Sequence, residues 1–263
     1  MRGLQIISTN LIKNFKQEVK ISVKKCFDEM SEKDFTVEDF KNYMLAGAVA
    51  SAQIEGSTLD LNSFYRSKQN KTNKKQVIEI ENLLTAYEYA RQYELTEDNL
   101  LKCHKVLAKA FTNITKKQKG EYRQTKVGIK SWHGLVYLAV EPQFVQTEMA
   151  KLFKDTNDLR QQNLSLKDVL YYASCIHYVF AKIHPFADGN GRVARLLEKW
   201  FLAKNLGEVA WSIPTEKFYY DNRQIYYANL NIGVNYYESL EKMDHILPFL
   251  LLLPKAVRYK PVD

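Results

Sequence analysis

Apolar residues recur at helical spacing along most of the chain. In the segment 77–93, Val77, Ile80, Leu84 and Tyr87 fall on one face of a helix, and residues 100–111 repeat this pattern. The polar run 68–75 predicts a loop. Together these patterns predict helices over 9–30, 38–53, 77–93, 100–111, 143–160, 165–182, 191–205 and 215–253, the last with a loop at about 232–245.

One region departs from the helical pattern. The segments Val127–Ile129 and Leu135–Val140 are short and apolar or β-branched, and a turn glycine, Gly134, separates them. This arrangement is typical of a β-hairpin. The chain has no internal repeat and no low-complexity linker, so we expect an all-α fold that carries one small β-hairpin.

Composition narrows the class of protein. A chain of 263 residues that is 46% apolar and 26% charged can bury a sizeable core. The net charge of +8 sits largely in short lysine-rich runs, which favours a solvated surface over a nucleic-acid site. The longest apolar run, 246–254, is too short to span a bilayer, and no apolar leader sequence is evident. We expect a cytoplasmic protein without a membrane or nucleic-acid partner.

The four histidines other than His184 do not predict a zinc site. His104 and His177 lie on apolar helix faces, which favours core positions. His133 and His245 have no evident metal-ligand partner.

The segment Ile183–Arg195 carries the most chemical information. Pro185 favours ending the preceding helix, and Gly189 and Gly191 permit a tight turn and a close backbone approach to a ligand. The chain then enters a helix, whose free N–H groups form a site for an anion.

Four side chains around this turn suit a phosphate-containing ligand. Arg192 and Arg195 lie about one helical turn apart, so both guanidinium groups can reach a polyphosphate. Asp188 is placed to hold a divalent cation, and His184 is placed to take a proton from an incoming hydroxyl. Each feature alone has a plainer explanation as a turn or a structural histidine. Their combination within so short a segment favours a site.

From His184 to Arg195 the sequence matches His-x-Phe-x-(Asp/Glu)-Gly-Asn-Gly-Arg-x-x-Arg at every defined position. The chain therefore resembles the Fic family of protein adenylyltransferases, in the subclass with an N-terminal inhibitory helix. The resemblance implies an all-α catalytic domain over 76–263, with a helical region over 1–75 that packs on it as one unit. It also implies transfer of AMP from ATP, with Mg²⁺, to a Ser, Thr or Tyr hydroxyl of a target protein or of the chain itself.

The same resemblance assigns roles to individual residues. His184 resembles the general base, and Asp188 resembles the magnesium ligand. The phosphate-binding residues that it implies are Gly189, Asn190, Gly191, Arg192 and Arg195.

An upstream string, Ser51-x-x-x-Glu55-Gly56, carries a second expectation. Alone, it indicates a helix C-terminus with Gly56 as the left-handed cap. Beside the signature it resembles the family's inhibitory motif, whose glutamate pairs with the second signature arginine, here Arg195. That charge-assisted pair would occupy the place of the γ-phosphate and repel the triphosphate, so we expect an autoinhibited protein.

The predicted hairpin resembles the flap over the family's active site. Val127, Gly128 and Ile129 would pair with an extended target segment by β-augmentation, and Trp132 at the turn is a candidate contact. The alternative is that the hairpin only covers the core. The stretch Lys130–Val140 is longer than the family's flap.

Downstream, Tyr226 and Tyr227 resemble a tyrosine pair near the adenine pocket. We assign Tyr227 and Asn235 to nucleotide binding, while Asn229 and Asn231 fit the asparagine role as well.

Two other functions fit the residues. The same fold could transfer another phosphate-containing group, or it could be a non-catalytic nucleotide-binding interaction module. The intact arginines favour AMP transfer because they fit a diphosphate leaving group, and the intact His184 and Asp188 disfavour a vestigial loop. A homodimer is also compatible with the resemblance.

Overall fold

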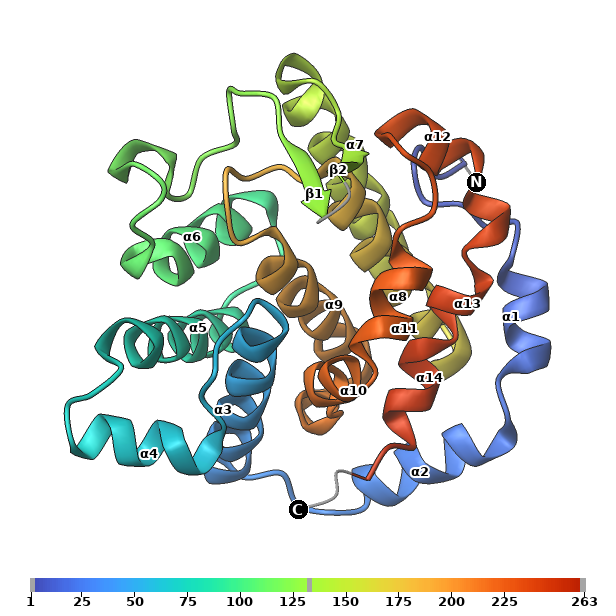
Figure 1. The fold of residues 1–263 in the computed structure, drawn as a ribbon. Helices are drawn as coiled ribbons and strands as arrows, with labels where there is room; N and C mark the ends of the chain where they lie inside the picture. The colour runs from blue at the N-terminus through green and yellow to red at the C-terminus, as the bar shows by residue number, and fades with distance from the viewer. Residues whose placement is uncertain (1–2, 132–133, 261–263) are drawn as a thin grey trace.

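The computed structural model describes residues 3–131 and 134–260. Two helices, α8 (Leu166–Ile183) and α9 (Asn190–Leu206), pack against each other at the centre of the molecule (Figure 1). Every residue from Val169 to Phe180 is buried. A helix that is apolar around most of its circumference must be covered on all sides, which explains why the other helices surround this pair.

The surrounding helices come from all parts of the chain. The N-terminal part forms α1 (Ile12–Glu18), α2 (Ile21–Ser31), α3 (Val37–Ile54) and α4 (Leu61–Gln69). The middle forms α5 (Lys74–Gln92), α6 (Glu97–Leu107) and α7 (Pro142–Arg160). The C-terminal part forms α10 (Thr215–Asp221), α11 (Arg223–Leu230), α12 (Tyr236–Glu241), α13 (Leu247–Leu250) and α14 (Leu252–Val257). Within 3–131 and 134–260, none of these helices is long and apolar enough to cross a membrane.

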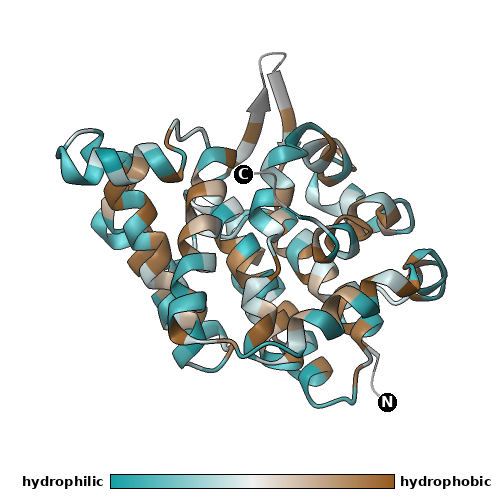
Figure 2. Cartoon of the chain, turned by 90° about the horizontal axis from the view of Figure 1, so that it is seen from below, coloured by the Kyte–Doolittle hydropathy of each residue, from teal (hydrophilic) through white to brown (hydrophobic). Residues whose placement is uncertain are grey.

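The predicted hairpin is present. Strands β1 (Gly128–Ser131) and β2 (Gly134–Leu138) are antiparallel and project from the helical body (Figure 2). Tyr137 ties the hairpin to α8, because its buried hydroxyl donates to the carbonyl of Lys182 at 2.7 Å. Leu138 donates its backbone N–H to Val234 at 2.9 Å, so the segment before α12 covers the other edge of β2. The expectation of an all-α fold with one small hairpin is confirmed.

Several predicted helices have other boundaries. Residues 9–30 form two helices because the backbone at Lys20 is extended. The predicted loop at 68–75 is shorter than expected, because α4 runs to Gln69. A capping box between Asp60 and Ser63 starts this helix. The 100–111 helix ends at Leu107.

The segment 215–253 is divided into short helices instead of two long ones. Asn235 caps the start of α12. Pro248 lies in the first turn of α13, where a missing N–H group is tolerated.

Residues 3–75 pack against the rest of the described chain. Helix α3 packs against α5, α9 and α10, while α1 packs against α8 and α2 against α14. The buried carboxylate of Asp155 in α7 accepts the backbone N–H groups of Gln5, Ile6 and Ile7 at 2.8–3.0 Å. Charge-assisted bonds of this kind fasten the start of the chain to the core. A division at residue 75 stays a prediction.

Candidate active site

The loop that joins α8 to α9 has a tightly defined shape. His184 ends α8 in the left-handed conformation, with φ 53°, and Gly189 precedes α9 with φ 84°. The Asn190 side chain closes the loop, because its Oδ1 accepts from the N–H of Phe186 and its Nδ2 donates to the carbonyl of Phe186, both at 2.8 Å. Asn190 is 2% exposed. Both polar atoms of this side chain therefore hold the loop, and the expected part of Asn190 in phosphate binding stays a prediction.

His184 presents one free ring nitrogen. Its Nδ1 lies 3.3 Å from the carbonyl of Ala181, which can only accept, so Nδ1 carries the hydrogen and Nε2 is left with a lone pair. Burial lowers the pKa of His184 to about 4, and the Arg123 guanidinium acts in the same direction. The ring is thus neutral at physiological pH and able to accept a proton.

Arg123 holds both the catalytic loop and the base of the hairpin. Its guanidinium is buried and donates to the carbonyls of Ile183 and His184 at 3.2 and 2.7 Å. It also donates to Thr125 and Val140, on the two stems of the hairpin, at 2.8 and 2.6 Å. A cation at the C-terminus of α8 is favoured by the helix dipole as well. One side chain therefore fixes His184 relative to the hairpin.

The second signature arginine meets the N-terminal motif, as expected. Arg195 is fully buried, and its Nε donates to Ser51 Oγ at 2.9 Å while an Nη donates to Glu55 Oε1 at 2.8 Å. Burial works to lower the pKa of Arg195, but the facing Glu55 carboxylate and nearby tyrosines raise it. Ser51, Glu55 and Arg195 thus form one cluster, in which Ser51 and Arg195 are buried and the Glu55 side chain is 30% exposed.

Glu55 also lies directly over the loop glycine. A Cβ atom placed on Gly191 would stand 2.3 Å from Glu55 Oε1, so the carboxylate fills the space above the first turn of α9. That turn carries free N–H groups and the positive end of the helix dipole. A carboxylate of Glu55 therefore occupies the place that favours a phosphate.

The end of α3 explains how Glu55 reaches this position. Gly56 has φ 99°, its N–H bonds to Gln53, and the N–H of Ser57 bonds to Ala52, which is a Schellman cap. Gly56 is therefore a helix cap, and it also follows the glutamate of the motif. A negative charge at a helix C-terminus is unfavourable by about 0.5 kcal/mol, and the ion pair with Arg195 offsets this cost for Glu55.

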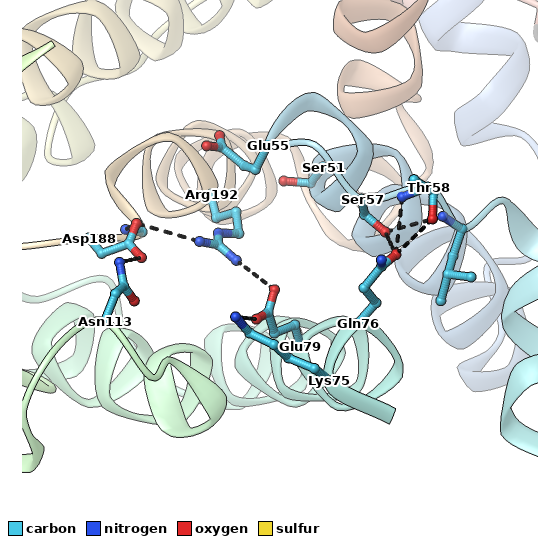
Figure 3. A network of polar contacts seen from close by, with 12 residues as sticks. Ser51, Glu55, Ser57, Thr58, Lys75, Gln76, Glu79, Asn113, Asp188 and Arg192 are labelled. Atoms are coloured by element: carbon cyan, nitrogen blue, oxygen red, sulfur yellow. Dashed lines mark hydrogen bonds and ion pairs between the residues drawn. The ribbon is translucent and has the colours of Figure 1, made fainter. Parts of the chain in front are cut away.

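The first signature arginine has different partners. Arg192 lies between two carboxylates, with Nη atoms 3.5 Å from Glu79 and 3.6 Å from Asp188, and it covers the ring of Phe111 at 4.1 Å (Figure 3). Its side chain is only 9% exposed, and its Nε is buried without a hydrogen-bond partner among the described residues. A buried guanidinium with unused donors suits an incoming anion.

Asp188 is the candidate metal ligand. One of its oxygens accepts from Asn113 Nδ2 at 2.8 Å, and the other accepts from the N–H of Gly189 at 2.6 Å. The described part of the chain holds no group of three or more metal-ligating side chains. A single partly exposed carboxylate fits Mg²⁺, which is commonly held by one or two carboxylates together with substrate phosphates and water.

The two residues predicted to bind the nucleotide, Tyr227 and Asn235, have different surroundings. Tyr227 donates to the carbonyl of Ile54 at 3.4 Å, so it lies at the end of α3 beside Glu55. Asn235 accepts from the N–H of Glu238 as the cap of α12. The structure thus gives Asn235 a capping contact, and its assignment to nucleotide binding stays a prediction.

The flap residues form the base of the hairpin. Val127 accepts from the N–H of Ala139 at 3.1 Å, while Gly128 and Ile129 pair with β2. Trp132 and His133 lie outside the described residues.

Sequence reasoning missed four supporting residues. His104 was assigned to the core and is buried, yet its ring stacks on Phe186 and contacts the carbonyl of Asp188 at 3.0 Å. Only Arg123 had a local signal, the Gly-Glu-Tyr-Arg string before the hairpin. The other three residues come from helices or turns without a motif. The four supporting residues are His104, Arg123, Glu79 and Asn113.

Comparison with known proteins finds similarity in the part of the chain that holds this site. Residues 94–202 match the model of the Fic/DOC family. The curated protein adenylyltransferase fic-1 of Caenorhabditis briggsae is 28% identical over 141 residues, which cover 54% of this chain and 24% of the relative. The chain spans about a quarter of the length of that relative.

Two solved structures share the fold. A Fic family protein from Desulfovibrio desulfuricans has a TM-score of 0.75 at 24% identity and covers 95% of this chain and 74% of its own. A Fic domain containing signaling protein from Bacteroides thetaiotaomicron has a TM-score of 0.72 at 21% identity, covering 93% and 94%. Over residues 94–202 the chain is similar to the Fic/DOC family, and its fold is shared with these two solved structures.

The environment of His184 yields a titration prediction. We expect its imidazole to titrate at about pH 4 instead of 6.5, because burial disfavours the charged ring. The unfolded chain then binds a proton that the folded protein does not, so stability falls as the pH falls from about 6.5 to about 4. NMR of the ring resonances, assigned with His184→Gln, measures this value. A pKa near 6.5 in the folded protein would contradict the geometry.

Arg123 yields a second prediction. Arg123→Met keeps much of the side-chain bulk but removes the side-chain hydrogen bonds to the loop and hairpin. We expect the free energy of unfolding to fall by about 3 kcal/mol, and the pKa of His184 to rise because a nearby cation is lost. Urea unfolding and the same NMR titration measure both effects. Arg66→Met, at an exposed position of α4, is the matched control, and equal losses in the two variants would refute the assigned role.

Proposed function

We propose that this protein is an adenylyltransferase that moves AMP from ATP to a Ser, Thr or Tyr hydroxyl of a target protein or of its own chain. The observation that carries the proposal is the pairing of a neutral His184 with a helix N-terminus flanked by Arg192 and Arg195. The curated relatives named protein adenylyltransferase support this class of reaction. ATP is then the co-substrate.

Each residue of the site has its own role in the proposed transfer. The target hydroxyl oxygen attacks the α-phosphorus, the bond from that phosphorus to the bridging oxygen of the diphosphate breaks, and pyrophosphate leaves. The hydroxyl proton passes to Nε2 of His184. Arg192 and the N-terminus of α9 stabilise the charge on the phosphates. Mg²⁺, held by Asp188, would neutralise phosphate charge and hold the leaving group in line.

We further propose that Glu55 restrains this reaction. Its carboxylate is bound to Arg195 and lies over Gly191, within the space that a terminal phosphate needs. ATP must compete with this pair, and a charge-assisted hydrogen bond contributes about 1.5–3 kcal/mol. The productive arrangement of the triphosphate is therefore expected to be disfavoured by about 10- to 100-fold.

The hairpin supplies the target side of the proposed site. Because β2 is covered by the segment at Val234 on one edge and by β1 on the other, the outer edge of β1 is the one that the described residues leave open for an extended target. Main-chain pairing there would bring a target hydroxyl towards the loop that Arg123 ties to the hairpin. The flap assignment of residues 127–129 rests on this arrangement.

The test is transfer of label from ATP labelled at the α-phosphate, in the presence of Mg²⁺. We expect Glu55→Gly to raise incorporation into protein by about 10- to 100-fold over the wild type, because Arg195 is released for phosphate. Adding His184→Ala to Glu55→Gly should abolish most of this gain, since general-base catalysis contributes about 100-fold or more.

Label from the γ-phosphate serves as the control for the alternative chemistry. Incorporation of γ-label without α-label would indicate phosphoryl transfer. ATP binding without incorporation of either label in all variants would indicate a non-catalytic nucleotide-binding module. Either result would overturn the proposed AMP transfer.

A further inference from the structure

The segment that leaves the proposed inhibitory helix is fastened by one side chain of α5. Gln76 Oε1 accepts three hydrogen bonds, from Ser57 Oγ at 2.8 Å, from Thr58 N–H at 3.0 Å and from Thr58 Oγ1 at 3.3 Å (Figure 3). A single amide oxygen therefore binds both residues that follow Gly56. This contact joins α5 to the chain immediately beyond the end of α3.

Little else holds this stretch. Glu55 and Gly56 are exposed, and a Cβ atom on Gly56 would meet nothing within 4 Å. The next buried side chain along the chain is Leu59, 2% exposed. A helix end that is exposed and lightly packed frays readily unless polar contacts hold it. Buried side chains and the Schellman cap hold the last turn of α3, whereas the exposed residues that follow it, with Glu55, depend on the contacts of Glu55 and of the Gln76 amide.

The same face of α5 also reaches the catalytic loop. Glu79 lies three residues after Gln76, so the two side chains point to neighbouring places on the helix surface. Glu79 pairs with Arg192 at 3.5 Å, whereas Gln76 binds Ser57 and Thr58 (Figure 3). Helix α5 is therefore the common support of the signature arginine and of the chain that follows Glu55.

We propose that Gln76 is a positioning residue for the inhibitory contact: by binding Ser57 and Thr58 it fixes the end of α3 and keeps Glu55 within reach of Arg195. The inference rests on the proposed function of Glu55. Without the amide oxygen, Ser57 and Thr58 exchange their contacts for water, and Glu55 leaves its place above Gly191 more often. The restraint on the triphosphate then weakens.

The experiment compares rates of α-label incorporation in two backgrounds. Gln76→Ala in the wild type is expected to raise the rate about fivefold, which corresponds to loss of about one net hydrogen bond. In the Glu55→Gly background the same substitution should leave the rate unchanged, because there is no carboxylate left to position. A role limited to general stability would instead affect both backgrounds alike.

Three further variants sharpen the test. Gln76→Glu retains an acceptor oxygen for all three bonds and should keep the low rate of the wild type. The double variant Ser57→Ala/Thr58→Val removes the side-chain donors and should raise the rate as Gln76→Ala does. Gln92→Ala, at an exposed position on the last turn of α5, is the matched control and should have no effect.

The possible results separate the two proposals. If Glu55→Gly raises the rate and Gln76→Ala does not, or if Gln76→Ala acts equally in both backgrounds, Gln76 does not position the inhibitory contact and the proposed restraint by Glu55 stands. If Glu55→Gly fails to raise the rate, the restraint itself is wrong and the role of Gln76 fails with it. Thermal unfolding of each variant shows that the compared proteins are folded.

Discussion

The buried guanidinium of Arg195 is held by a carboxylate, and this interaction organises the site. Arg195 lies at the centre of the helical body with no exposure to solvent, and its donors are bound by Ser51 and Glu55 of α3. Leaving such a charge without a partner would be strongly destabilising. An anion must therefore face Arg195 whether or not a ligand is bound. Under the proposed function, Glu55 and a phosphate of ATP compete for this one position.

The constraint requires that everything around Arg195 be held in place. Asn190 closes the loop through Phe186, and His104 supports it from α6. Arg123 connects the loop to both stems of the hairpin. Because these contacts lie within the protein, the loop does not need a ligand to take its shape. Glu55 and Gly56, at the end of α3, are exposed, and nothing lies within 4 Å of a Cβ placed on Gly56, so this part of the site is the one best able to move.

The sequence predicted the hairpin, the loop between two central helices and the pairing of Glu55 with Arg195. These features depend on local patterns or on a long motif, so they can be read from neighbouring residues. The division of 215–253 into short helices was missed, because apolar spacing alone does not reveal where a cap such as Asn235 or a proline such as Pro248 interrupts a helix. The contacts of Asn190 with Phe186 could not be predicted for a related reason, since a residue type does not tell which way its amide points.

The supporting contacts illustrate the limit of sequence patterns more generally. Glu79 lies on an amphipathic helix, and the sequence does not distinguish it from the other charged positions of that helix. Glu79 becomes a partner of Arg192 because α5 packs beside α9. Gln76 is likewise one polar residue among many near a polar run. Long-range contacts of this kind depend on tertiary structure, and no local spacing encodes them.

The central claim is that Glu55 and the terminal phosphate of ATP occupy the same place beside Arg195. Crystal structures of the wild type and of Glu55→Gly, each with Mg²⁺ and a non-hydrolysable ATP analogue, test it directly. The account predicts that Arg195 contacts the terminal phosphate in the variant, whereas in the wild type Arg195 stays on Glu55 and the phosphates are displaced. The same phosphate positions in both structures, with the Glu55–Arg195 pair intact in the wild type, would contradict it.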